Sequence, residues 1–248
     1  MSVGANDLCA FYCLSYNNEE RKSAISERFE QLNIDVKFYD GVSFDDPRIS
    51  IPLENNDGLK KTWSYTYGHF DIINKFINET DKEYGVFCED DIYLNKELAN
   101  DIPRLVEDFK ALNLDVLLLG YLTKYKIETG LVEYGVKQLH SEEQIQIRER
   151  NYHNYPDNLW GGQMYMLSRI HAKNLLDKYY YGYAENSLNA ELQLTPFCSD
   201  WTITKDGNRA IVYPMYAVED GKTHYEDGGQ NNFHKDCFYC NYDPTQFI

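Results

Sequence analysis

Three consecutive acidic residues, Glu89, Asp90 and Asp91, follow directly after a short apolar run at residues 86–88. The run has β-branched, aromatic and small side chains, which suit a strand that is buried on both faces. Three acids cannot be buried together unless a cation neutralises them, so we expect them at the strand's carboxyl-terminal tip, where open α/β sheets bind ligands. Carboxylates at alternate positions suit Mg2+ or Mn2+, and such an ion could hold a diphosphate and stabilise it as a leaving group. A solvated acidic turn is the alternative interpretation.

The elements that would position these acids alternate between strands and helices through the first half of the chain. A buried strand is predicted over residues 8–16, followed by a helix with one apolar face and a second short strand over 34–39. An amphipathic helix over 58–77 leads into the strand before the acids, and a further helix after them leads into the most apolar run, 114–122. This alternation predicts an α/β fold with a mostly parallel sheet flanked by helices.

The second half of the chain is less regular. Residues 124–155 are polar, charged and rich in Tyr, and a mobile insertion over the site is one interpretation of them. A strand that ends at a helix cap is predicted over 160–168, a short helix begins near Trp201, and a final strand covers 209–215. Because the chain has no repeats and no low-complexity linker, we expect one domain over residues 1–248.

The composition excludes several classes of function. The formal net charge of −16 argues against nucleic acid or an anionic membrane as the main partner. No apolar run approaches the roughly 20 residues that a transmembrane helix needs. The first seven residues have no basic and no apolar leader segment, which favours a cytoplasmic location and reduced thiols for the six cysteines. A viral protein made in the host cytosol, or a domain cut from a larger protein, would have the same features.

Five segments of the chain, taken in order, resemble glycosyltransferase family 25. This is the family of lipooligosaccharide galactosyltransferases and collagen hydroxylysine galactosyltransferases. The likeness covers roughly residues 8–225, and Gly68 stands where the family usually has Ser. The five segments are Cys-Leu-Ser-Tyr at 13–16 with Glu20 and Arg21, Tyr-Gly-His at 67–69, Phe-Cys-Glu-Asp-Asp-Ile at 87–92, Trp-Gly-Gly-Gln-Met-Tyr-Met-Leu-Ser at 160–168, and Ser-Asp-Trp at 199–201.

The resemblance implies a GT-A-like fold of Rossmann type, a nucleotide-sugar donor, dependence on Mn2+ or Mg2+, and inversion at the sugar carbon. It divides the chain into a nucleotide-binding half at about 8–122, an acceptor-side half at about 123–225, and a tail at 226–248.

Each site residue is carried over from the resemblance to a matching position. Glu89 and Asp91 would bind the metal, and Asp90 would contact the ribose or the donor sugar. A histidine near the end of the chain would complete the metal shell, with His224 the first choice and His234 the second.

Further residues would bind the donor or activate the acceptor. Tyr16 and Arg21 lie where such folds bind the nucleotide, although Tyr16 could also simply pack at a strand end. Lys222 could help to neutralise the departing diphosphate. Asp200 is the candidate general base for the acceptor hydroxyl, with a helix cap before Trp201 as its alternative role.

The sequence therefore favours a metal-dependent inverting glycosyltransferase that moves galactose or glucose from a UDP-sugar. The acceptor would be a glycan or a collagen-like hydroxylysine, and the acidic charge of the chain slightly favours the Lys-rich collagen-like acceptor. Two alternatives stay open. One is a catalytically silent module that binds sugar or nucleotide, which the departure at Gly68 supports, and the other is a metal-dependent phosphohydrolase.

Overall fold

The computed structural model of the protein describes residues 3–54, 56–127, 135–139, 150–222 and 229–248. Its centre is a seven-stranded sheet with the strand order β2-β1-β3-β7-β5-β8-β6. Strands β2, β1, β3, β5 and β8 run in one direction, and β7 and β6 run in the other. The sheet is therefore mixed but mostly parallel, as predicted. Its strands are β1 (Cys9–Ser15), β2 (Val36–Asp40), β3 (Tyr84–Glu89), β5 (Val116–Leu122), β6 (Asn151–Asn154), β7 (Trp160–Ser168) and β8 (Arg209–Tyr213).

A separate two-stranded sheet lies beside the tip of β3. It pairs β4 (Ile92–Leu94) with β9 (Ala217–Glu219) in antiparallel fashion, and the register sets Ile92 opposite Glu219. The backbone N–H of Asp220 also donates to the carbonyl of Asp91 at 2.7 Å. This small sheet brings the acidic end of β9 next to the acidic tip of β3.

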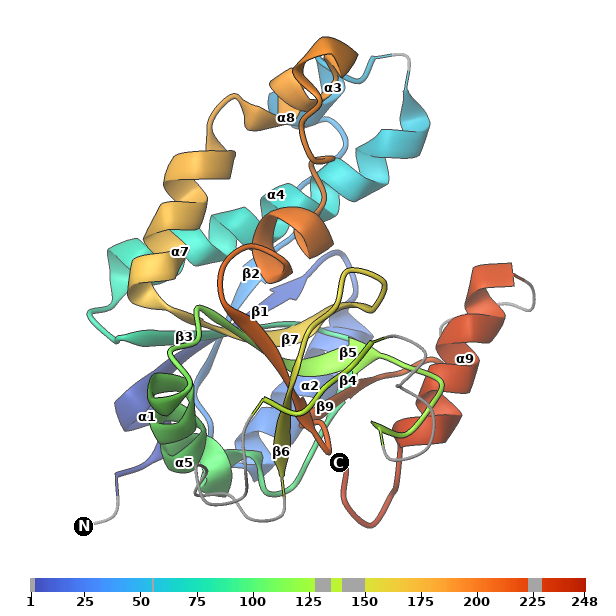
Figure 1. Ribbon diagram of the computed structural model, residues 1–248. Helices are drawn as coiled ribbons and strands as arrows, with labels where there is room; N and C mark the ends of the chain where they lie inside the picture. Colours follow the sequence, from blue (N-terminus) through green and yellow to red (C-terminus); the bar gives the residue numbers. More distant parts are fainter. Residues whose placement is uncertain (1–2, 55, 128–134, 140–149, 223–228) are drawn as a thin grey trace.

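Helices cover both faces of the main sheet (Figure 1). Along β1, Tyr12 and Leu14 pack into the core under α4 and α7, whereas Phe11 and Cys13 pack into the core under α1, α2 and α5. The helices and helical turns are α1 (Ala5–Leu8), α2 (Glu19–Gln31), α3 (Pro47–Ser50), α4 (Asp57–Glu79), α5 (Leu98–Ala111), α7 (Arg169–Leu175), η3 (Leu176–Tyr180), α8 (Tyr183–Ser187), η4 (Ala190–Leu192), η5 (Asp200–Thr204) and α9 (Gly229–Asn241).

The predicted helices and strands of the first half are confirmed, with ends that differ by one or two residues. Helix α4 buries Trp63, Tyr67 and Phe70 on one face, as its apolar period predicts. Asn18 caps α2, and its side chain accepts the N–H of Arg21 at 3.0 Å. In the described part of the chain, no helix combines the length and the apolar character needed to cross a membrane.

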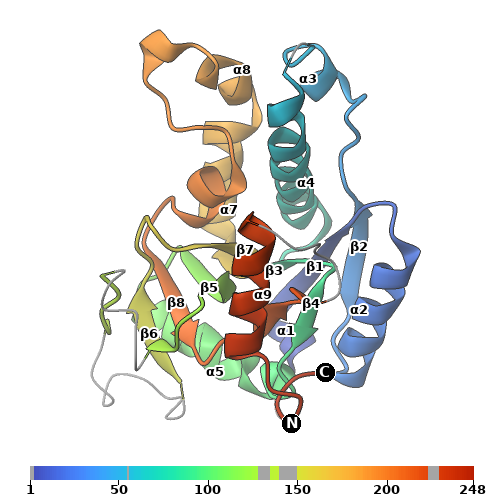
Figure 2. The same ribbon diagram turned by 90° about the vertical axis from the view of Figure 1, so that its right-hand side faces the viewer.

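Several elements lie where the sequence predicts none, and β6 and α9 are two of them. Strand β6 is a short, polar strand whose one fully buried side chain is Tyr152, and it pairs only with β8 among the described strands. Helix α9 lies in the predicted tail, and it packs against β9 (Figure 2). Both elements have weak apolar patterns, because each buries only a few of its side chains.

Candidate active site

The acidic tip of β3 is buried rather than solvated. Glu89 ends the strand, and Asp90 and Asp91 form the turn before β4, where each is only 7% exposed. The side chain of Ser15, at the end of the neighbouring β1, donates to Asp90 at 2.7 Å. The interpretation as a solvated turn is therefore wrong, and the prediction that the acids sit at a strand tip is confirmed.

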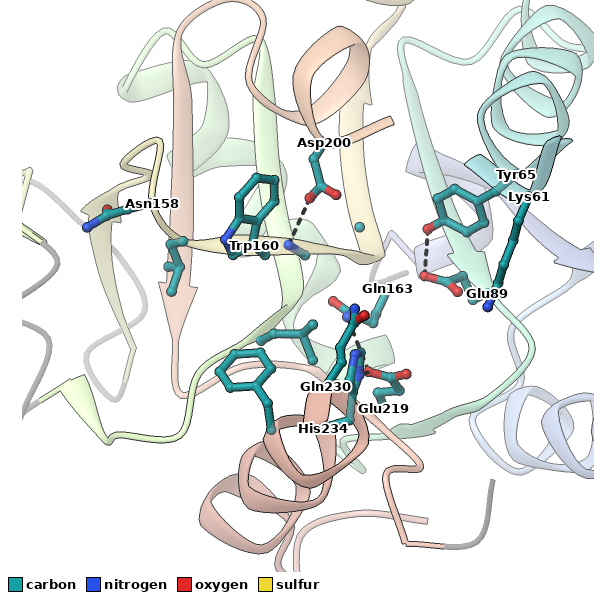
Figure 3. Close-up of a pocket in the computed structure, with 15 residues that line it drawn as sticks. Lys61, Tyr65, Glu89, Asn158, Trp160, Gln163, Asp200, Glu219, Gln230 and His234 are labelled. Atoms are coloured by element: carbon teal, nitrogen blue, oxygen red, sulfur yellow. Dashed lines mark hydrogen bonds and ion pairs between the residues drawn. The ribbon is translucent and has the colours of Figure 1, made fainter. Parts of the chain in front are cut away.

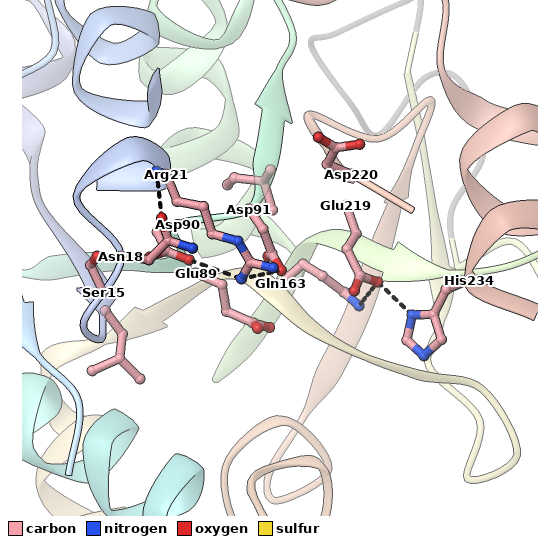
Figure 4. Close-up of polar contacts among 12 residues, drawn as sticks. Ser15, Asn18, Arg21, Glu89, Asp90, Asp91, Gln163, Glu219, Asp220 and His234 are labelled. Carbon is pink, nitrogen blue, oxygen red and sulfur yellow. Dashed lines mark hydrogen bonds and ion pairs between the residues drawn. The ribbon is translucent and has the colours of Figure 1, made fainter. Parts of the chain in front are cut away.

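Arg21 reaches into this acidic tip from the first turn of α2 (Figure 4). Its Nη1 lies 3.2 Å from Asp91 Oδ2 and 3.6 Å from Asp90 Oδ1. The cap at Asn18 fixes the start of the helix and so fixes the direction of the arginine side chain. The arginine and the two aspartates line a cavity of about 380 Å3, together with Glu20, Ala24, Arg28 and Asp220.

Burial, followed by repulsion from nearby acids, raises the pKa of two carboxyl groups at the tip. Burial, followed by the nearby charge of Glu219, raises the pKa of Asp91 to about 7 in spite of Arg21. Burial and the charges of Asp91 and Glu219 raise the pKa of Glu89 well above its ordinary value. A bound cation would favour the charged form of both carboxyl groups.

The chemistry of this tip fits a divalent cation. Asp91 Oδ1 is buried and has no hydrogen-bond partner among the described residues, and carboxylate oxygens are the ligands that Mg2+ and Mn2+ prefer. Nevertheless, the described segments contain no group of three Asp, Glu, His or Cys side chains arranged to hold a metal ion. The predicted third ligand, His224, lies outside the described residues.

A histidine and a further acid, Glu219, lie on the other side of the tip. His234 on α9 has its Nδ1 2.8 Å from Glu219 Oε2, and Gln163 Nε2 lies 3.5 Å from the same oxygen (Figure 4). Gln163 comes from β7 and Glu219 ends β9. Side chains from β7 and α9 thus meet at the carboxylate of Glu219 on β9.

A second and larger cavity, about 710 Å3 in volume, opens between the tip of β3 and the start of β7 (Figure 3). Glu89 lies on one wall, Asp200 on another, and Glu219 and His234 on a third. Tyr65 of α4 donates to Glu89 at 2.7 Å, and the pKa of its hydroxyl is raised by burial and then by the charge of Glu89. The cavity therefore brings together Glu89 and Asp200, to which the resemblance assigns the metal and the general base.

The backbone of β7 holds the side chain of Asp200, which does not cap a helix. It is the first residue of η5, and its Oδ1 accepts the N–H of Gly161 at 3.0 Å. Burial raises the pKa of this carboxyl, and the Gly161 N–H and the charge of Lys205 lower it by less. The interpretation of Asp200 as the cap before Trp201 is wrong, because its carboxylate bonds to a neighbouring strand.

The remaining predicted site residues lie at the edge of these cavities or beyond them. Tyr16 is 47% exposed just after β1, where its side chain packs against Gly41, and it lines neither cavity. Lys222 is exposed and lines neither cavity, although its N–H donates to Asp220, which lines the smaller one.

The structure adds Glu219, Gln163 and Trp160 to the residues around the larger cavity. A signal for Glu219 is visible in the sequence, because the apolar run at 215–218 ends in the pair Glu219-Asp220, as the run before Glu89 ends in acids. Gln163 and Trp160 belong to the segment at 160–168, which is predicted as a strand and resembles the family, but the sequence indicates no role in the site for either residue.

Comparisons with known proteins agree with the predicted family. The model of glycosyltransferase family 25, described as an LPS biosynthesis protein, matches residues 10–186. The matched region includes the acidic tip of β3 and the whole of β7, and it ends before Asp200. No curated protein matches the chain.

Several solved structures are similar to the chain at low identity. A197 from STIV is 13% identical, with 89% of this chain and 86% of that chain covered and a TM-score of 0.45. Mannose-1-phosphate geranyltransferase from Thermus thermophilus is 10% identical over 84% of this chain and 74% of that chain, with a TM-score of 0.45. A glycosyltransferase involved in the glycosylation of the major capsid of PBCV-1 is 10% identical over 82% and 81%, with a TM-score of 0.37. These likenesses are too distant to indicate a substrate.

Proposed function

Because the chain belongs to glycosyltransferase family 25, we propose that it transfers galactose or glucose from a UDP-sugar, with inversion at the sugar carbon, to a glycan or a hydroxylysine acceptor. The observation that carries this proposal is the position of Glu89 and Asp200 on separate walls of one cavity. A displacement with inversion needs a leaving group stabilised on one side of the sugar and a base on the other.

The acidic tip of β3 would form the donor side of this cavity. Glu89 and Asp91 would bind Mn2+ or Mg2+, with His224 as a third ligand. The free Oδ1 of Asp91 and the raised pKa values of both carboxyl groups support this assignment, because a cation would relieve their repulsion. When bound, the ion would neutralise the diphosphate of the donor.

Arg21 and Asp90 would orient the donor. Arg21 Nη1 already lies within 3.6 Å of both aspartates, so a small movement of its side chain would bring it onto a phosphate oxygen. Tyr16 and Lys222 would contact the nucleotide and the diphosphate from the rim, where both side chains are exposed. Asp90, fixed by Ser15, would accept a hydroxyl of the ribose or the sugar.

Asp200 would act as the general base on the acceptor side. It would take the proton from the acceptor hydroxyl while that oxygen bonds to the anomeric carbon and the bond from this carbon to the diphosphate oxygen breaks. The N–H of Gly161 would hold the carboxylate in place during this step, and burial would raise its basicity.

Replacement of one metal-binding acid tests the proposal. Asp91→Ala should abolish the Mn2+-dependent part of UDP binding, measured by calorimetry with Mn2+ and with a chelator, because it removes one of two proposed carboxylate ligands. Asp57→Ala is the matched control, since that side chain is 90% exposed and pairs only locally with Lys60. Unchanged UDP affinity of Asp91→Ala in Mn2+ would contradict the metal assignment.

A further inference from the structure

Trp160 is a large aromatic side chain that lies open on the wall of the larger cavity (Figure 3). It is 42% exposed, whereas Trp63 is buried in the core at 1% exposure. It begins β7, directly before the Gly161 whose N–H holds Asp200. The indole ring therefore lies next to the glycine that holds the proposed general base in place.

The indole ring is held in place from one side. Lys205 Nζ lies 3.9 Å from the centroid of the Trp160 ring and 4.2 Å from that of Trp201. The ring of Trp201 meets Trp160 edge to face, with centroids 5.9 Å apart. The same ammonium donates to the carbonyl of Asp157 at 2.6 Å, which ties the arrangement to the backbone. A rigid aromatic surface of this kind loses little conformational entropy when a ligand stacks on it.

The ammonium of Lys205 decides which ligands can use this surface. A cation over an indole ring is attracted by the negative face of the ring, and here Lys205 already takes that place. A second cation on the opposite face would be repelled by the first. The side chain of Trp160 therefore suits a neutral ligand better than the ammonium of a hydroxylysine.

The neighbouring groups fit a sugar ring. A pyranose has an apolar C–H face and a rim of hydroxyl groups, so it is recognised by an aromatic surface combined with amide groups at its edge. Leu159 and Phe233 extend the apolar wall, and the amides of Asn158 and Gln230 line the same cavity.

We propose that Trp160 is the stacking surface for a neutral saccharide acceptor, whose hydroxyl then reaches Asp200. The inference rests on the proposed transferase function, and it selects the glycan among the two acceptor classes. It assigns Trp160 a role in acceptor specificity, supported from behind by Lys205 and Trp201.

The indole N–H signals in a nitrogen-15 NMR spectrum test this proposal without any nucleotide. The chain has three tryptophans, so Trp160→Phe and Trp201→Phe assign their signals. A panel of neutral methyl glycosides of galactose, glucose, mannose and N-acetylglucosamine should include at least one that shifts the Trp160 signal saturably. Free 5-hydroxylysine at the same concentrations should leave this signal unchanged.

Two variants measure the contribution of the ring. Trp160→Ala should weaken the binding of the responding glycoside, followed from the Trp201 signal, by about tenfold or more, since an aromatic contact and its buried area are lost. Tyr181→Ala removes a ring that is 77% exposed outside the cavity and should leave the affinity unchanged.

The proposal would be overturned if no glycoside moves the Trp160 signal, if hydroxylysine alone moves it, or if Trp160→Ala binds the glycoside as tightly as the parent chain. These outcomes are separate from a failure of the transferase proposal, which would be seen as absent UDP binding or absent UDP-sugar turnover in the parent chain.

Discussion

Asp200 combines two properties that a general base needs, a fixed position and a raised pKa. The N–H of Gly161 holds its Oδ1 at 3.0 Å, and burial raises its pKa above the ordinary value for Asp. A base acts in its deprotonated form, so turnover should fall as the pH is lowered through this raised pKa. The acid limb of the pH profile should therefore lie above the range of an ordinary aspartate.

Asp200→Asn separates catalysis from donor binding. The amide oxygen of Asn can still accept the Gly161 N–H, but the side chain can no longer take a proton. We expect the turnover number to fall by about 10²–10⁴-fold while the Kd for UDP in Mn2+ stays within about twofold. Asp157→Asn, at an exposed carboxylate near Lys205, is the control. An equal loss of turnover and affinity, or no loss of either, would remove Asp200 as the base.

At the scale of elements, the start of β7 joins the two sides of the site. Gly161 has a φ of +151°, and a Cβ there would lie 2.5 Å from the Cα of Tyr121 on β5. Only glycine fits where the two strands approach so closely. At this position the Gly161 N–H donates to Asp200. The close approach of the two strands thus explains the glycine at position 161 without reference to any ligand.

Gly161→Ala should lower the free energy of unfolding by about 3 kcal/mol or more, because a backbone contact must move and the φ angle becomes strained. Gly162→Ala is a matched control one residue further along the strand. A Cβ there would meet Tyr65 Oη at 3.4 Å and Thr204 Cγ2 at 3.9 Å, so a change within about 1 kcal/mol is expected. Urea unfolding of both variants measures the difference, and equal destabilisation would contradict this account of the strand.

The elements could be predicted from the sequence where their apolar pattern is strong. The strand over 114–122 is predictable because nearly all of its side chains are buried, and the helix over 58–77 because one of its faces is apolar. Strand β5 and helix α4 confirm them. Strand β6 and helix α9 could not be predicted, since their places depend on contacts with β8 and β9 that no local pattern records. His234 on α9 is therefore brought to the site by tertiary packing and not by its local sequence.

At the scale of the whole molecule, a buried histidine couples folding to pH. His69 on α4 is fully buried, its Nδ1 lies 2.8 Å from the hydroxyl of Tyr165, and its Nε2 has no partner among the described residues. Burial lowers its pKa from 6.5 to about 3. Between these two values the unfolded chain binds a proton at this residue and the folded chain does not.

The folded state should therefore lose stability as the pH falls from about 6.5 towards about 3. The contribution from His69 alone is about 1.4 kcal/mol per pH unit. His69→Asn lacks this contribution, so its free energy of unfolding should fall less steeply over the same range. Above about pH 7 the histidine is neutral in both the folded and the unfolded state. The difference in the free energy of unfolding between the parent chain and His69→Asn then reports the packing loss alone. If the free energy of unfolding has the same slope against pH in both chains, this account of His69 is contradicted.

The candidate site could be predicted in part because two of its walls carry local motifs. The acidic tip of β3 and the segment around Asp200 are visible in the sequence, and the structure brings both to one cavity. The wall formed by Glu219 and His234 depends on the pairing of β9 with β4, a contact between residues that are far apart in the sequence. Trp160 lies within a predicted strand, but its exposure in the cavity is a property of the folded molecule.

Release of UDP from UDP-galactose and UDP-glucose, with Mn2+ and with a chelator, tests the central claim most directly. The account predicts slow, Mn2+-dependent release from at least one of these donors in the absence of an acceptor. It also predicts loss of this release in Glu89→Gln, which keeps the size of the side chain and its bond to Tyr65 but removes the charge. Release that is absent for every UDP-hexose, or equal in Mn2+ and in chelator, would contradict a metal-dependent UDP-hexose transferase.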